Sequence, residues 1–480
     1  MKWRVSFHLP FFSVKVGKMD SKHLTREIFR IALPAITGFL SILFFDLADI
    51  FWISKLGTDA VAGVAASGFL EFAVYSLMGF TSVGCCALIA QARGEKDQKK
   101  AYQVAREAIH LTLVFSIILT IFLTVTGPHL LRWMGLSDSA FDAGLSYYHV
   151  FAKGIVVFYF YQLLGQVFYA HGDTKTAVLT LAAAFLLNAI LDPLLIFGIW
   201  IFPKLGVQGA ALGTLISLLA GVALRLYLLR KKKYIDRLKT FTERSSYYFS
   251  DILRIGVPTS TARLIWALVY PLLTSLVTRF GMAPLAGLTI AHRIEAFGYF
   301  TAYGFCVAMT TLVGHAVGKR DFSLARSIAY RGRWLVSCVL LPLTCIFVIA
   351  PHYLVRLASD DPEVIRQGVA YLRSVGLLEI FLGWEMVFEG SFNGIGNTRP
   401  YMLISVPLTF GRYPLAYFLV EHLGFGVTSI WWSIAISTTL KGVAMSFLFR
   451  RTSPCPARRA APELGLTPPE ISLHKEDVVE

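Results

Sequence analysis

Long apolar runs alternate with short polar connections along most of this chain. A helix needs about 20 mostly apolar residues to cross the hydrocarbon core of a bilayer. Twelve runs meet or approach that length, so the pattern predicts an all-α integral membrane protein with twelve transmembrane helices. The predicted spans are residues 30–53, 61–90, 108–127, 147–170, 177–199, 208–229, 252–278, 284–313, 334–350, 370–391, 402–420 and 427–449.

Composition agrees with this pattern and limits what lies outside the membrane. Of 480 residues, 55% are apolar and only 16% are charged, against about 25% charged in ordinary soluble domains. We expect two six-helix lobes joined by a short basic segment, with no large extramembrane catalytic domain and no cofactor. The expected divisions are a basic N-terminal tail (1–26), a first lobe (27–229), a basic linker (230–251), a second lobe (252–450) and a C-terminal tail (451–480).

The formal net charge of +15 follows the predicted topology. Most Lys and Arg residues fall in the tails and in the even-numbered loops, which the positive-inside rule assigns to the cytoplasm. The pattern therefore predicts a multi-pass protein of the plasma (inner) membrane with both termini cytoplasmic. It favours contact with the lipid bilayer over nucleic acid as the meaning of the positive charge.

The two predicted lobes repeat one another at an offset of 224 residues. Because each lobe has an even number of spans, the repeats are parallel, and a cavity between them can open to either side as the lobes rock, which is alternating access. Three pairs of segments carry the repeat: Ile31-Ala-Leu-Pro34 with Ile255-Gly-Val-Pro258, Gly57 and Gly63 with Gly281 and Gly287, and Ala92-x-Gly94-xx-Asp97 with Ala316-x-Gly318-xx-Asp321.

An ordered set of short motifs resembles the multidrug and toxic compound extrusion (MATE) family over roughly residues 25–450. The resemblance implies an exporter of drugs, toxic compounds or metabolites, coupled to protons or sodium. His315 departs from the pattern, since the family more often has Gln there. The motifs are Lys55-Leu-Gly57 after Asp49, Gln91-Ala-x-Gly94-xx-Asp97, Asn188-xxx-Asp192-Pro193, Leu205-Gly-Val-x-Gly-Ala-Ala211, Pro284-Leu-Ala-Gly287 and Gly394-Ile-Gly-Asn-Thr398.

Polar side chains inside the spans of the first lobe are the leading site candidates, because charge at membrane depth is costly and tends to be functional. Asp46 and Asp49 share a face of one helix, and Asn188 and Asp192 share a face of another. Pro193 leaves the Ala189 carbonyl without its helical donor. Such an oxygen-rich patch suits a hard cation, and two carboxyl groups kept from water also share a proton readily.

Helix geometry brings these groups to a common depth, with Asp49 about 10 Å and Asp192 about 7 Å outside the midplane. The resemblance implies that Asp49, Tyr147, Asn188, Asp192 and Thr214 couple transport to a cation, and that sodium, if used, binds at Asp49, Asn188 and Asp192. The alternative is that they are hydrogen-bond partners that only fix helix packing. The 224-residue offset replaces three of them by Leu273, Arg412 and Ala416, which confines the predicted cation site to the first lobe.

Charged residues in the second lobe form a secondary set. Arg293, Glu295, Glu385 and Glu389 either neutralise buried charge in pairs or present charge to a substrate. Aromatic side chains near the lobe interface are candidates for stacking on a cationic substrate. They are Phe158, Tyr159, Tyr161, Tyr299, Phe300, Tyr303 and Trp384.

The function predicted is therefore a cation-coupled antiporter, acting as a monomer on small molecules such as organic cations or amphipathic drugs. One alternative is a flippase for lipid-linked saccharides, which would use the arginines of the lobe interior around a pyrophosphate. Another is a membrane enzyme acting on lipids. The sequence lacks metal-binding His clusters, nucleophile motifs and phosphate-binding Gly loops in the required context, which argues against an enzyme.

Overall fold

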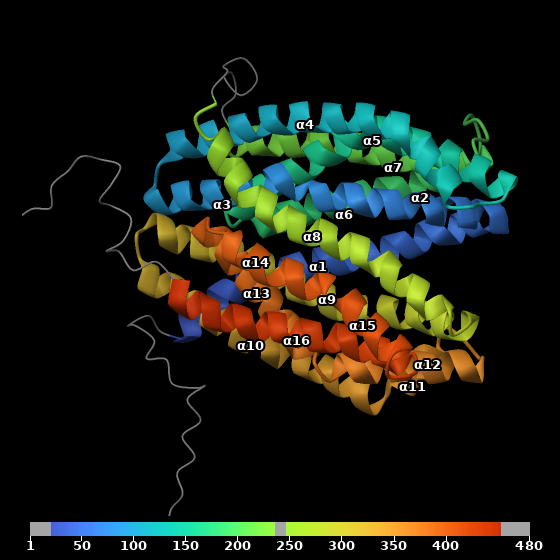
Figure 1. Cartoon of the computed structure of the whole chain (residues 1–480). Coiled ribbons are helices and arrows are strands. Elements are labelled where there is room, and N and C mark those ends of the chain that lie inside the picture. The colour runs from blue at the N-terminus through green and yellow to red at the C-terminus, as the bar shows by residue number, and fades with distance from the viewer. Residues whose placement is uncertain (1–20, 236–245, 453–480) are drawn as a thin grey trace, which may run out of the picture.

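A computed structural model describes residues 21–235 and 246–452, and within these ranges all regular structure is α-helical. This confirms the predicted all-α fold (Figure 1). Residues 1–20, 236–245 and 453–480, which hold most of the two tails and part of the linker, lie outside the described residues. The first half contains α1 (Ser21–Ser54), α2 (Thr58–Leu77), α3 (Gly79–Glu95), α4 (Gln98–Trp133), α5 (Asp138–Ala170), α6 (Thr174–Phe197) and α7 (Val207–Lys231).

The second half repeats this order with more interruptions. It contains α8 (Phe249–Thr278), α9 (Met282–Gly318), α10 (Phe322–Ile349), α11 (Pro351–Arg356), α12 (Pro362–Gly376), α13 (Glu379–Ile395), α14 (Arg399–Phe410), α15 (Arg412–Glu421) and α16 (Thr428–Thr452). In the described ranges, eleven helical segments are long and apolar enough to cross a membrane. The predicted span 370–391 is divided between α12 and α13, so neither piece reaches that length alone.

The outer surface of the bundle is apolar, as a lipid-facing surface must be. On α4, for example, Ile118 is 60% exposed, and on α6 Leu186 is 68% exposed. Neighbouring side chains on the same outward faces, such as Ile121 and Val125, are exposed as well. A soluble protein would not expose such continuous apolar surface, so the packing agrees with the multi-pass membrane architecture.

Equivalent aspartates end the same turn in each half. The carboxylate of Asp97 accepts a hydrogen bond from the backbone N–H of Lys100 at 2.9 Å and so caps α4. Asp321 caps α10 in the same way, with the N–H of Leu324 at 2.8 Å. These bonds satisfy backbone donors that a helix N-terminus leaves unpaired, which explains why the Gly-xx-Asp motif occurs twice.

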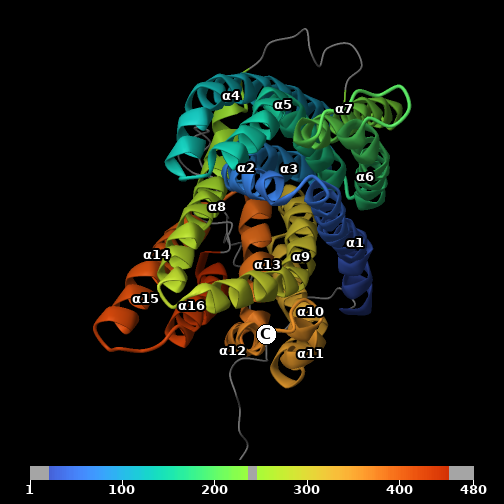
Figure 2. The ribbon, with the colours of Figure 1, turned by 90° about the vertical axis from the view of Figure 1, so that its right-hand side faces the viewer.

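Two helices cross from one half to the other (Figures 1 and 2). Ile28 and Ile31 of α1 pack in a core formed mainly by α9, α10 and α13 of the second half. Their repeat equivalents Ile252 and Ile255 of α8 pack in a core formed mainly by α3, α4 and α5 of the first half. The start of each lobe is therefore held by the other lobe.

The halves also meet where α3 crosses α9, at the end of the bundle that carries the Lys- and Arg-rich connections, here called the basic end. A Cβ on Gly94 would clash with the carbonyl oxygen of His315, and one on Gly318 with that of Gln91. Absence of a side chain at both positions lets the two backbones touch. The repeated Gln/His-xx-Gly motifs thus form a symmetric contact between the lobes.

Side chains reinforce this contact by hydrogen bonds that obey the same symmetry. Nε2 of Gln91 donates to the carbonyl oxygen of Gly394 at 2.9 Å. Nε2 of His315 lies 2.9 Å from the carbonyl oxygen of Ala170 and donates to it. Gln91 and His315 are 224 residues apart, as are Ala170 and Gly394. The departure from the family pattern at His315 therefore keeps the bond that a Gln would make.

Candidate functional site

The most buried polar group of the first lobe lies between α6 and α7. Asn188 and Asp192, one helical turn apart on α6, are both fully buried, and the amide of Asn188 donates to Oδ1 of Asp192 at 2.7 Å. The same amide lies 3.3 Å from the hydroxyl of Thr214 on α7. Gly213 allows this approach, since a Cβ there would stand 2.5 Å from Oδ1 of Asp192.

Asp49 completes this group from α1. Its carboxyl lies within hydrogen-bonding reach of the Asp192 carboxyl, a geometry that two ionised carboxylates avoid and that a shared proton or a cation stabilises. Within the described residues, Oδ1 of Asp49, Oδ2 of Asp192 and Oδ1 of Asn188 are buried without a hydrogen-bond partner. Buried oxygens of this kind are ready ligands for a proton or a hard cation.

Tyr147 joins the group through a residue that the sequence analysis did not single out. Its hydroxyl hydrogen-bonds the carboxyl group of Glu71 on α2, and Glu71 lies within electrostatic range of both Asp46 and Asp49. An acidic residue within a predicted span was the available signal. Glu71 was noted only as the repeat equivalent of Glu295, and its contact with Tyr147 depends on how α2 packs against α5.

Asp46 lies at the edge of the group and is more exposed than Asp49. It is within electrostatic range of Asp49 and also of Arg293, which belongs to α9 of the second half. The structure therefore brings together Asp46, Asp49, Glu71 and Asp192 from three helices. The predicted set Asp49, Tyr147, Asn188, Asp192 and Thr214 belongs to this one group of contacts, here called the acidic cluster, which includes Asp46 and Glu71.

The second lobe repeats part of the acidic cluster. The hydroxyl of Tyr371 donates to Oε2 of Glu295 at 2.5 Å, which reproduces the pair of Tyr147 and Glu71 at the 224-residue offset. In the described ranges no ion pair joins Arg293 to Glu295. Glu379, which has no acidic equivalent in the first lobe, lies fully buried within electrostatic range of Glu295.

Two other acidic residues of the second lobe are neutralised by cations of the protein. Lys441 donates to Glu385 at 2.7 Å with both side chains buried. Arg263 donates to Glu389 at 2.6 Å. Charge compensation of this kind is what a low-dielectric interior demands, and it explains why both glutamates occur within a span.

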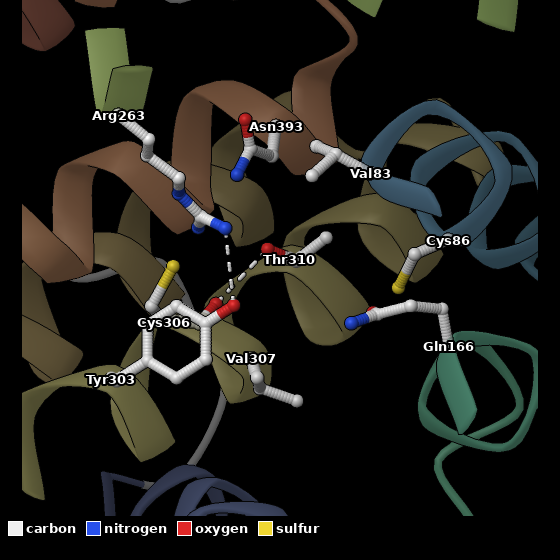
Figure 3. Close-up of a pocket in the computed structure, with 9 residues that line it drawn as sticks. All are labelled: Val83, Cys86, Gln166, Arg263, Tyr303, Cys306, Val307, Thr310 and Asn393. Atoms are coloured by element: carbon white, nitrogen blue, oxygen red, sulfur yellow. Dashed lines mark hydrogen bonds between the residues drawn. The ribbon is translucent and has the colours of Figure 1, made fainter. Parts of the chain in front are cut away.

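The halves enclose a small pocket near the crossing of α3, α8 and α9 (Figure 3). Of the aromatic candidates, Tyr303 lines this pocket, whereas Phe158, Tyr159 and Tyr161 are buried in the first-lobe core. The remaining lining comes from both halves: Val83, Cys86 and Gln166 from the first, and Arg263, Cys306, Val307, Thr310 and Asn393 from the second.

A repeated two-lobe helical bundle, with a buried acidic cluster and a pocket between the lobes, defines a multi-pass membrane transporter. The MatE family model matches residues 34–194 and again residues 258–418, two segments that are themselves 224 residues apart. The chain therefore belongs to the MATE family of transporters.

Known relatives cover nearly the whole chain. A probable multidrug resistance protein, NorM, of Thermotoga maritima is 25% identical over 88% of this chain and 91% of its own length. A protein of Shewanella oneidensis named FAD transporter is also 25% identical, over 90% of this chain and 95% of its own. A crystal structure of MATE in complex with MaL6 superposes with a TM-score of 0.83 at 24% identity, covering 89% of this chain and 96% of that one.

Proposed function

We propose that this protein is a cation-coupled antiporter that exports small molecules by alternating access of its two lobes. Relatives named as multidrug resistance proteins support export of drugs or toxic compounds. The family match also argues against the flippase alternative. The basic end is then cytoplasmic, the protein resides in the plasma membrane, and one chain suffices because each chain contains both lobes.

The observation that carries the coupling proposal is the facing pair Asp49 and Asp192. Their unpartnered oxygens, with that of Asn188, offer a site that either a proton or sodium can occupy. A gradient drives export only if the ion binds one conformation better than the other. Asp49 lies on α1, which contacts both lobes, so rocking of the lobes changes its distance from Asp192 and hence the affinity for the ion.

The test replaces each carboxylate by an amide of the same size. Asp49→Asn and Asp192→Asn should each abolish gradient-driven export, because an amide carries no negative charge and releases no proton. Purified variants in proteoliposomes are loaded with an exported dye and given either an imposed sodium gradient or an imposed proton gradient. The gradient that drives the wild-type protein identifies the coupling ion.

Asp142→Asn is the matched control, since Asp142 is an exposed carboxylate on α5 outside the acidic cluster. It should export at the wild-type rate. Folding of all variants is checked by gel filtration and thermal unfolding in detergent. Wild-type export by well-folded Asp49→Asn and Asp192→Asn proteins would assign these residues to helix packing alone.

The substrate is proposed to be a ring-containing, amphipathic small molecule. Relatives carry names that range from multidrug resistance protein to FAD transporter, so the charge that the substrate carries is better judged from the pocket itself. The sequence pattern favoured an organic cation partly because of Glu385 and Glu389. Each of these now has a cationic partner within the protein, which removes that support.

A further inference from the structure

The polar atoms that face the pocket between the lobes are mainly hydrogen-bond donors. Oδ1 of Asn393 accepts from the hydroxyl of Thr259 at 2.9 Å, so the amide nitrogen of Asn393 is the group turned toward the pocket (Figure 3). The amide nitrogen of Gln166 points into it from the opposite lobe. The hydroxyl of Tyr303 accepts from Arg263 at 3.3 Å, which leaves its own proton to donate.

Arg263 presents positive charge to this pocket although it belongs to an ion pair. Its side chain is 24% exposed, whereas that of Glu389 is 1% exposed. A ligand that enters the pocket therefore meets the guanidinium before the carboxylate. Two of the five guanidinium N–H donors serve Glu389 and Tyr303, and the planar fork suits bidentate binding of a carboxylate or phosphate group.

A row of aromatic rings continues from the pocket along α8 and α9. Tyr303 stacks on Tyr299 with centroids 6.1 Å apart and planes within 8°. Tyr299 stacks on Trp266 at 6.3 Å and 12°. Trp266 in turn contacts the ring of Phe72, which belongs to α2 of the first lobe, at 5.3 Å. The near-parallel planes offer flat surfaces, only partly buried, on which a planar ring can stack.

We propose that Arg263, Asn393 and the aromatic row of Trp266, Tyr299 and Tyr303 form a binding site for planar aromatic anions. The rings of the ligand lie against the row, and its carboxylate or phosphate group accepts hydrogen bonds from Arg263 and Asn393. Rows of donors with an exposed guanidinium disfavour an organic cation by repulsion. This inference rests on the proposed export function and specifies its substrate class.

Three probes with one ring system and different charge test the proposal: 2-naphthoate, 2-naphthamide and 2-naphthylmethylammonium. Their binding to the detergent-purified protein is measured by isothermal titration calorimetry, without any ion gradient. We expect naphthoate to bind about tenfold more tightly than the neutral amide, and the ammonium compound more weakly than both. Trp266→Leu should weaken naphthoate and naphthamide alike, because both share the ring.

Substitutions in the ion pair should change naphthoate affinity in opposite directions. Arg263→Gln should lower it to the level of naphthamide, and Arg263→Lys should retain part of the preference. Glu389→Gln should raise it, because the guanidinium is no longer neutralised. A pair that serves only folding would instead show losses for both substitutions. Arg333→Gln is the matched control, since Arg333 also contacts tyrosine and tryptophan rings, Tyr330 and Trp384, but lies outside the pocket.

Equal affinity for the three probes, or a preference for the ammonium compound, would overturn the assignment of an anionic substrate. A rise in naphthoate affinity that is absent from Glu389→Gln would overturn the role given to Arg263. These results are independent of coupling, because no gradient is present. Loss of dye export in the Asp49→Asn experiment tests the proposed function separately.

Discussion

Gly213 is a single residue on which the geometry of the acidic cluster depends. Its missing side chain leaves room for Oδ1 of Asp192, which a Cβ would approach to 2.5 Å. Real Cβ atoms do not come this close, so Gly213→Ala should displace Asp192 or push α7 from α6. We expect the rate of gradient-driven export to fall about tenfold or more, because coupling groups misplaced by about 1 Å lose much of their effect.

Gly68→Ala provides the control for this prediction. Gly68 is also helical and lies in the same lobe, but no atom stands within 4 Å of a Cβ built there. Both variants are compared in the proteoliposome export assay, with thermal unfolding measured in parallel. Equal rates for the two variants would show that the position of Asp192 has no influence on coupling.

Glu71 and Glu295 form a comparison that the internal repeat provides. Each accepts a hydrogen bond from an equivalent tyrosine, Tyr147 or Tyr371. Only Glu71 lies beside an Asp49, since the equivalent position in the second lobe is Leu273. Glu71→Gln should therefore reduce gradient-driven export more strongly than Glu295→Gln, because it alters the charge that the Asp49 and Asp192 pair experiences.

The measurement is export at several sizes of the driving gradient. Glu71→Gln should require a larger gradient for the same rate, whereas Glu295→Gln should remain close to wild type. Glu295→Asn should likewise impair export less than Asp192→Asn. An equal or greater loss at Glu295 would move the coupling group into the second lobe and contradict the reading that the first lobe alone contains it.

At the level of elements, the long apolar runs made the twelve spans and their repeat predictable. Hydrophobicity indicates that a segment lies in the membrane, but a segment such as α1 is apolar on most faces and does not specify its neighbours. The crossing of α1 and α8 into the opposite lobes therefore required the structure. Shared depth predicted the meeting of Asp49 with Asp192. The meeting of Glu71 with Tyr147 depends on helix rotation, which depth does not determine.

The α3–α9 crossing is the element that joins the lobes at the basic end. Gln91→Ala removes the side-chain hydrogen bond to the Gly394 carbonyl while keeping the backbone contact through Gly94 and Gly318. A net hydrogen bond contributes about 1 kcal/mol, so the joined conformation should lose about fivefold in population relative to the separated one. His315→Ala should have a similar effect through its bond to Ala170.

Distances between spin labels measure this shift. Lys99→Cys and Ser323→Cys, exposed and repeat-equivalent positions at the basic end, carry the labels in a background without other cysteines. Gln91→Ala should add a population at longer distance. Gln98→Ala is the control, because the Gln98 amide also donates to a carbonyl, that of Lys233, but within one half. An identical distance distribution in Gln91→Ala and wild type would contradict a joining role for this bond.

At the scale of the whole molecule, the two ends of the bundle differ in charge and in how the lobes are held together. The basic end carries most of the Lys and Arg residues and also the hydrogen bonds between the lobes, including those of Gln91, His315 and Thr311. If charge places the basic end in the cytoplasm, the conformation described is joined on the cytoplasmic side. Orientation therefore decides which side of the membrane this conformation closes.

Cysteine labelling in intact cells tests that orientation. Lys99→Cys lies at the basic end, and Ser139→Cys lies at the opposite end, with both positions exposed. A membrane-impermeant maleimide added to cells should label Ser139→Cys and leave Lys99→Cys unlabelled until the membrane is permeabilised. The positive-inside rule requires this result, because Lys and Arg near the spans are retained in the cytoplasm during insertion. Labelling of Lys99→Cys in intact cells would invert the topology and place the joined end of the lobes outside the cell.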